Sequence, residues 1–106
     1  MTPIFFAVSI TGTGNTTVYG PTTAARTSMV VNLCNRGGSP ARVRLAIAAS
    51  ATPVDGEWLE YDFPLDPAGL RGNTLERGGL AVPSGKYVVV RSDVGTVSAQ
   101  VSGVES

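Results

Sequence analysis

The hydrophobic residues of this chain fall in short runs in which apolar and polar positions alternate. No window of about twelve residues repeats apolar positions at helical spacing, and the runs end at Gly, Pro or Asn. Such alternation is typical of β-strands with one buried face. The pattern predicts strands at about residues 4–10, 15–20, 27–35, 41–49, 58–63, 74–82, 86–92 and 96–104. We therefore expect an all-β domain, because seven or eight short strands fit a two-sheet sandwich.

The third and fourth predicted strands have the pattern of a β-hairpin around a Gly-Gly-Ser-Pro loop. In this arrangement Leu33 lies opposite Val43 on an apolar face, and the two arginines of the fourth strand lie on the solvated face. A shift of one residue would place Leu33 opposite an arginine, whereas a shift of two would keep the apolar face. The pattern thus predicts which side chains are buried and leaves the register open. The C-terminal third repeats strand, turn and strand, which suggests two related β-meanders.

Three consecutive valines interrupt the alternation in the seventh predicted strand, at residues 88–90. A strand that is apolar at every position is covered on both of its faces. The cover is either the second sheet together with a loop, or a partner subunit. Val88 and Val90 are therefore candidate interface residues.

The chain divides into residues 1–14 and residues 15–106. The first part is an apolar run that contains Phe5 and Phe6, followed by the Gly-rich segment at residues 11–15. It is expected to be an edge strand of the sandwich or an arm that pairs with a neighbouring subunit. Phe5 and Phe6 are candidate contact residues in either case, and the second part is the β-sandwich domain.

Residues 49–73 form a long crossover around one short strand that begins at Trp58, the only tryptophan. The apolar face of this strand is expected to carry Leu59, Tyr61 and Phe63. Trp58 is expected to point away from that face, either as a lid over the edge of the sandwich or as a contact anchor. Glu60 and Asp62 are expected on the solvated face. Trp58, Glu60 and Asp62 are therefore also candidate interface residues.

Composition limits the chemistry that the chain can perform. The 106 residues suffice for one domain, and eight basic and eight acidic residues cancel, which argues against nucleic acid or an anionic membrane as partners. The absence of histidine excludes His-dependent triads and His-ligated zinc. Cys34, the single cysteine, cannot form an internal disulfide and has no neighbouring base. The N-terminal run reads poorly as a signal peptide, so folding in the cytoplasm is expected.

No known cofactor or metal motif is complete in the sequence. Gly12-Thr13-Gly14 lacks the third glycine and the helix of a dinucleotide loop, and Ser84-Gly85-Lys86 lacks the hydroxyl residue of a phosphate loop. Glu60 and Asp62 lack the regular spacing of a calcium loop. We therefore predict no catalytic, cofactor-binding or metal-binding residues, and a protein that is not an enzyme.

Five segments carry a resemblance to a known family. They are TTVY at 16–19, MVVNLCNRG at 29–37, ARVRLAIA at 41–48, LERGGL at 75–80 and VPSGK at 82–86. In this succession the chain, over roughly residues 15–104, resembles small immunoglobulin-like β-sandwich virion proteins of tailed bacteriophages. The resemblance implies an immunoglobulin-like fold without catalytic residues. It also implies a role as a capsid decoration or cement subunit, or as a module of the tail.

Two functions follow from the residues and the resemblance together. The first is a multi-copy capsid decoration or cement subunit, assembled in the host cytoplasm, that stabilises the virion by contacts with the major capsid protein, other virion proteins or its own copies. The alternative is a tail-associated fibre, adaptor or baseplate module, which could bind a host surface glycan through Trp58, Glu60 and Asp62.

Overall fold

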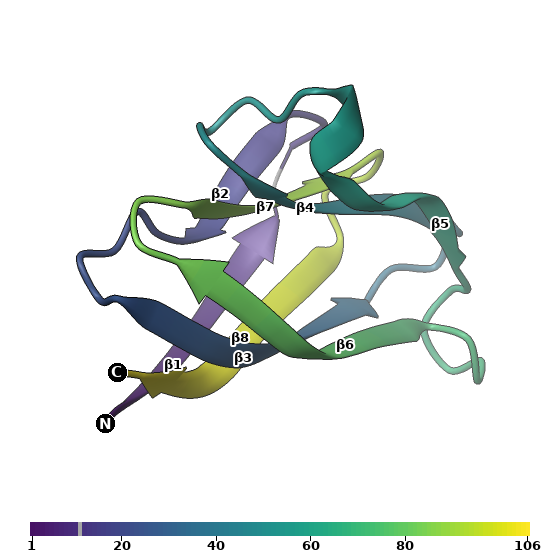
Figure 1. The fold of residues 1–106 in the computed structure, drawn as a ribbon. Coiled ribbons are helices and arrows are strands. Elements are labelled where there is room, and N and C mark those ends of the chain that lie inside the picture. The colour runs from purple at the N-terminus through teal and green to yellow at the C-terminus, as the bar shows by residue number, and fades with distance from the viewer. Residues whose placement is uncertain (11) are drawn as a thin grey trace.

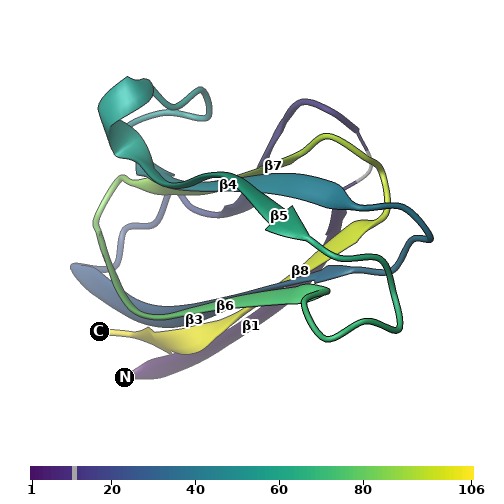
Figure 2. The same cartoon turned by 90° about the vertical axis from the view of Figure 1, so that its right-hand side faces the viewer.

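The computed structural model describes residues 1–10 and 12–106 and consists of two stacked antiparallel sheets (Figures 1 and 2). Its elements are β1 (Thr2–Ile10), β2 (Asn15–Tyr19), β3 (Arg26–Asn35), β4 (Ala41–Ala48), the 3₁₀ helix η1 (Asp55–Glu57), β5 (Trp58–Leu65), β6 (Thr74–Pro83), β7 (Tyr87–Ser92) and β8 (Val97–Glu105). The predicted all-β sandwich is confirmed, and the strand bounds differ from the predicted ones by two residues at most. Among the described residues, no helix is long and apolar enough to span a bilayer.

The strands pair as if the chain were one long hairpin folded over on itself. β1 pairs with β8, β2 with β7, β3 with β6 and β4 with β5, all antiparallel. The further pairs β3–β8 and β4–β7 join these ribbons into sheet A, in the order β1-β8-β3-β6, and sheet B, in the order β2-β7-β4-β5. Every connection except that between β4 and β5 runs from one sheet to the other. An eight-stranded double sheet of this kind is a jelly roll.

This strand order corrects three expectations. An immunoglobulin domain keeps several consecutive strands paired within one sheet, whereas here β4 and β5 are the one consecutive pair that shares a sheet among the described strands. The predicted hairpin of β3 and β4 is wrong, because these strands belong to different sheets. The two predicted meanders are wrong for the same reason. The predicted buried faces of β3 and β4 are nevertheless correct, since Leu33 and Val43 both lie in the core between the sheets. The predicted apolar face of β5 is wrong, because Leu59 and Tyr61 are 49% and 60% exposed.

Asn35 fixes the corner at which the chain leaves β3 for the other sheet. Its buried side chain donates hydrogen bonds from Nδ2 to the carbonyl oxygens of Ser39 and Asp66, at 2.8 and 3.1 Å. Its Oδ1 accepts from the backbone N–H of Gly37 and the hydroxyl of Thr96, at 3.0 and 2.9 Å. All polar groups of the amide are satisfied, so its burial costs little and ties three loops together.

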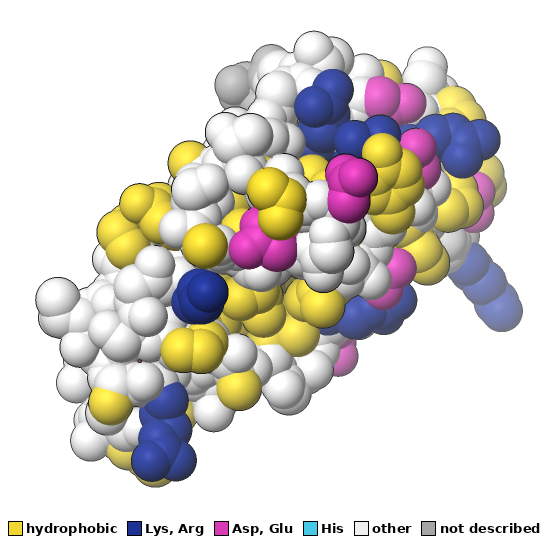
Figure 3. All heavy atoms as spheres, turned by 45° about the horizontal axis from the view of Figure 1, so that its top comes forward, with side chains coloured by type: hydrophobic (Ala, Val, Ile, Leu, Met, Phe, Trp, Pro, Cys, Tyr) yellow, Lys and Arg dark blue, Asp and Glu magenta, His cyan; other side chains and the backbone are white. Residues whose placement is uncertain are grey.

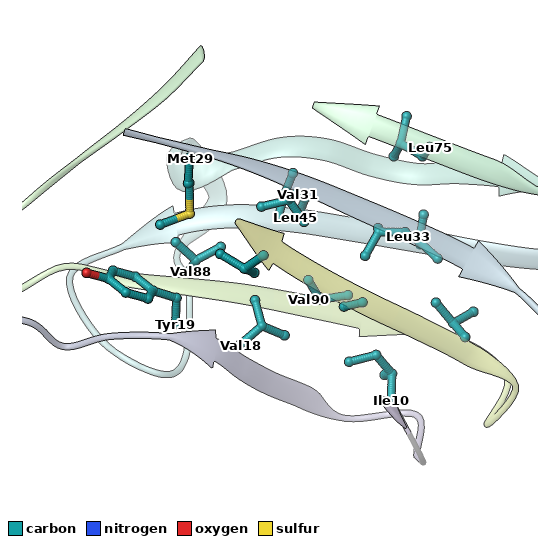
Figure 4. Close-up of a cluster of buried hydrophobic side chains, with 14 of the residues drawn as sticks. Ile10, Val18, Tyr19, Met29, Val31, Leu33, Leu45, Leu75, Val88 and Val90 are labelled. Atoms are coloured by element: carbon teal, nitrogen blue, oxygen red, sulfur yellow. The ribbon is translucent and has the colours of Figure 1, made fainter. Parts of the chain in front are cut away.

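The core lies between the sheets and consists mainly of aliphatic side chains, several of which are drawn in Figure 4. The outer side of sheet B is also partly covered, because Ala46, Ala48 and Val89 are fully buried on it. The connection from β4 to β5, which contains η1, lies over this side of the sheet (Figures 1 and 2). Glu57 holds that connection in place by accepting hydrogen bonds from the backbone N–H groups of Ala49 and Val54, both at 2.9 Å.

Candidate interaction surfaces

A β-bulge in β5 shapes the outer face of sheet B. The pairs Val43–Phe63 and Leu45–Glu60 enclose one residue of β4, Arg44, and two residues of β5, at positions 61 and 62. Asp62 has a φ of 55°, in the left-handed region that L side chains rarely adopt. Bulges of this kind redirect side chains, and here both bulged residues contact the single residue opposite them.

Arg44 is held between an aromatic ring and a carboxylate. Its Nε donates to Oδ1 of Asp62 at 2.7 Å, and its Cζ lies 3.9 Å from the centroid of the Tyr61 ring. The Trp58 ring centroid is 5.8 Å from the same Cζ and 6.0 Å from the Tyr61 ring, which it meets edge to face. The hydrogen bond lowers the pKa of Asp62 and raises the pKa of Arg44. The result is an ordered Trp-Arg-Tyr-Asp cluster on the surface.

Glu60 and Asp62 do not share a face, contrary to the sequence-based expectation. Glu60 forms an ion pair with Arg77 of β6, and this pair bridges sheets B and A along the side of the sandwich. The guanidinium of Arg77 also lies 5.8 Å from the Phe63 ring. The bulge separates the two carboxylates, so a carboxylate pair is absent at these positions. It also brings Trp58 against Tyr61, although Trp58 was expected to point away from it.

Phe5 and Phe6 are exposed on β1, with 62% and 45% of their surface accessible. The Phe6 ring packs against that of Tyr19 in β2, with centroids 5.9 Å apart. Within the chain, β1 pairs in unbroken register with β8 and forms an edge of sheet A. The division at residues 14 and 15 stays a prediction, and Thr11 of the expected hinge lies outside the described residues.

β1 differs from the other three edge strands. β2 and β6 are interrupted by register shifts, and β5 has two shifts and carries charged residues and a proline. Bulges, charges and prolines are the devices by which edge strands avoid pairing with other chains. β1 is nine residues long and has no charged residue, and only Pro3 near its start interrupts its donor groups. Its free edge is therefore the one best suited to accept another strand.

Val88 and Val90 are fully buried in the core between the two sheets (Figure 4). Val89 points to the opposite side of β7 and is buried there with Ala46, its cross-strand neighbour. The second sheet and the β4–β5 connection thus cover the valine run. Neither candidate valine offers a surface to a partner in this fold.

Cys34 and the acidic residues form no metal site in the described part of the chain. The Cys34 side chain is half-buried, and its Sγ is 3.8 Å from Nδ2 of Asn73. No group of three or more His, Cys, Asp or Glu side chains with metal-binding geometry occurs among residues 1–10 and 12–106.

Sequence reasoning named Trp58, Glu60 and Asp62 and missed Arg44 and Tyr61, which are central to the cluster. The residue types gave a usable signal, since Trp, Tyr and Arg are enriched at the energetic centres of interfaces. The bulge that brings them together has no local sequence signature here, because the left-handed position is occupied by Asp and not by Gly.

Fold and surfaces together define a jelly-roll β-sandwich with one unprotected edge strand. The chain is similar to a pentameric capsid protein from metagenomic phage sequences, with 22% identity and a TM-score of 0.55 over 98% of this chain and 61% of that one. It is also similar to the capsid structure of Helicobacter pylori bacteriophage KHP30, with 12% identity and a TM-score of 0.58 over 99% of this chain and 87% of the other. The nucleoplasmin-like N-terminal domain of Drosophila FKBP39 has 10% identity and a TM-score of 0.54, over 98% and 90%.

These identities establish a shared fold. The chain spans about three fifths of the length of the metagenomic capsid protein. No protein-family model matches the sequence, and no curated protein matches it significantly.

Proposed function

We propose that this chain is a structural subunit of a bacteriophage capsid, present in many copies and acting through protein–protein contacts. The observation that carries the proposal is the jelly-roll fold, which matches two phage capsid structures over nearly the whole chain. One of those proteins is described as pentameric. A subunit that decorates or cements the shell, assembled in the host cytoplasm on the major capsid protein, fits this likeness.

The edge of β1 supports assembly in many copies. An uncharged, continuous edge strand adds readily to a strand of another chain, and the exposed Phe5 and Phe6 side chains would add apolar contact beside it. Each subunit that touches two neighbours makes the later contacts effectively intramolecular, so weak single interfaces suffice for a stable lattice.

Purified virions provide the test. Quantitative gel densitometry against the major capsid protein is expected to give a copy number on the order of hundreds, as capsid lattices offer to multivalent subunits. A number below about a dozen would reject the capsid role and favour the tail.

A charge placed on β1 tests the edge. Ala7→Lys is expected to reduce incorporation into particles, because edge lysines oppose strand addition. Ala81→Lys, at an exposed position of the interrupted edge strand β6, is the matched control and should be incorporated normally. Equal incorporation of both variants would remove β1 from the proposal.

A tail module that binds a host glycan is the second candidate. The observation in its favour is Tyr61, which is 60% exposed and whose ring meets the Trp58 ring edge to face, since exposed aromatic rings suit sugar faces. Glycan-array binding that is lost in Tyr61→Ala would support it. Binding that survives this change would remove the site.

A further inference from the structure

Three arginines converge on the outer face of sheet B. Arg44 of β4 lies directly opposite Arg91 of β7, and Arg42 lies two residues before Arg44 on the same face. They line a pocket of about 280 Å³ together with Thr13, Asp62 and Asp93. Figure 3 looks onto this side of the molecule and shows basic, acidic and hydrophobic side chains gathered near one another.

The pairing of Arg44 with Arg91 is unfavourable for folding alone. Like charges directly opposite one another on adjacent strands destabilise a sheet. Asp62 relieves the repulsion only in part, because its carboxylate bonds to Arg44. Asp93 uses its Oδ1 to accept the backbone N–H of Arg42, at 2.8 Å.

Two guanidinium groups of the pocket have no partner among residues 1–10 and 12–106. Within the described part of the chain, the Arg42 and Arg91 side chains make no ion pair and no side-chain hydrogen bond. Three positive charges thus face two negative ones. The charges of Arg42 and Arg91 also help to lower the pKa of Asp62, after the larger effect of Arg44, which agrees with their convergence on one point.

We infer that this pocket binds a carboxylate side chain, Asp or Glu, presented by a partner protein. Planar guanidinium groups match carboxylates with two parallel hydrogen bonds. Tyr61 stands next to Arg44 and is largely exposed, which provides apolar contact area beside the charged pocket. Arg and Tyr in this combination are the residue types that dominate interface energetics.

A protein carboxylate fits better than nucleic acid. Asp62 and Asp93 line the same pocket and would repel a continuous row of phosphates, whereas a single carboxylate needs only the one excess positive charge. The inference deepens the proposed function and rests on it only for the identity of the partner as a virion protein.

Binding of a model acidic peptide to the full chain tests the pocket. The probe is an acetylated and amidated hexaglutamate, titrated at low salt by calorimetry. Saturable binding that weakens with added salt is expected. Arg42→Gln and Arg91→Gln should each weaken it about tenfold. Arg26→Gln and Arg71→Gln, at exposed arginines outside the pocket, are matched controls and should bind as wild type does.

A gain of affinity is a second readout, which no folding defect can imitate. Asp93→Asn removes one negative charge and keeps an oxygen acceptor for the Arg42 N–H, so it should tighten peptide binding. Arg91→Gln should also keep or raise the melting temperature, because it removes the charge opposite Arg44.

Three results would each overturn the assignment. They are no saturable binding of hexaglutamate, an equal loss in Arg26→Gln, or tighter binding of a hexathymidylate than of the peptide at the same salt. The peptide titration does not involve virions, whereas the copy number does not involve the pocket. Failure of the pocket and failure of the capsid role are therefore distinguishable.

Discussion

The hydroxyl group of Tyr19 in β2 donates a hydrogen bond to the carboxylate of Glu105 in β8, and so joins sheet B to sheet A. The same hydroxyl lies 2.8 Å from Oγ1 of Thr27, a residue that is fully buried. Because the Tyr19 proton goes to Glu105, Thr27 donates to Tyr19. One phenol group thus satisfies two polar side chains that are far apart in the sequence.

Tyr19→Phe should lower the free energy of unfolding by about 1–3 kcal/mol, since it removes the hydrogen-bond partner of the buried Thr27 hydroxyl. Urea denaturation measures the change. Tyr61→Phe, which removes an exposed hydroxyl, is the control and should stay within about 0.5 kcal/mol of wild type. Equal values for the two variants would show that the Tyr19 bonds do not stabilise the fold.

Leu45→Ala should cost about 2–5 kcal/mol, because the side chain is fully buried between the sheets and its loss leaves a cavity. Leu59→Ala removes the same atoms from a side chain that is 49% exposed, and a much smaller loss is expected. Chemical denaturation of both variants tests the placement of the core. A larger loss for Leu59→Ala would contradict it.

Gly103→Ala should destabilise the protein by overpacking, at the upper end of about 1–3 kcal/mol. A Cβ at this position of β8 would lie 2.0 Å from the carbonyl oxygen of Ser28 in β3, a backbone atom that cannot move aside alone. Gly78→Ala is the control, because its Cβ would meet nothing closer than a Val30 methyl at 3.7 Å. Thermal unfolding of both variants provides the comparison, and equal melting temperatures would contradict the close approach of β3 and β8.

Glu57 should contribute to acid sensitivity. Its hydrogen bonds from the N–H groups of Val54 and Ala49 lower the pKa of its carboxyl below the ordinary value of 4.5. A lowered folded-state pKa adds stability that is fully present above the unfolded-state value and is lost as the pH falls through the folded-state value. The loss therefore occurs below about pH 4.5.

Glu57→Gln should lower the urea midpoint at pH 7 and reduce the further drop between pH 5 and pH 2. Gln keeps one oxygen acceptor and has no titrating group. Glu76→Gln, at an exposed carboxylate with no side-chain hydrogen bond among the described residues, should follow the wild-type curve. Parallel curves for Glu57→Gln and wild type would contradict the role of Glu57.

The strands, and the buried faces of those without a bulge such as β4, could be predicted from the sequence, because alternation depends only on which residues face the core; in β5 the bulge leaves Leu59 and Tyr61 exposed. Which strands pair with one another could not be predicted from the sequence. Leu33 and Val43 point inward whether their strands form a hairpin or stand in opposite sheets, so the apolar pattern is the same in both cases. The choice is made by distant partners, such as the bonds of Asn35 to Asp66 and Thr96.

The candidate surfaces were predictable only in part, because residue type can be read from the sequence and the pairing of distant strands cannot. Phe5, Phe6 and Trp58 stood out by residue type and lie at accessible or half-buried positions, and their role as contact residues stays a prediction. The opposition of Arg44 and Arg91 depends on the pairing of β4 with β7, which no local pattern encodes. The cluster around Arg44 depends on a bulge that shifts the alternation of β5 midway.

The place of β8 between β1 and β3 has a consequence for synthesis. Of the eight strands β8 leaves the ribosome last, yet it forms the middle of sheet A and pairs with the first strand, with Thr2 opposite Glu105 (Figure 1). Until residues 97–105 emerge, β1 has no neighbour in its own sheet. The nascent chain must therefore keep its apolar first strand unpaired in its own sheet until β8 has been made, and this nine-residue strand completes the sheet in one late step.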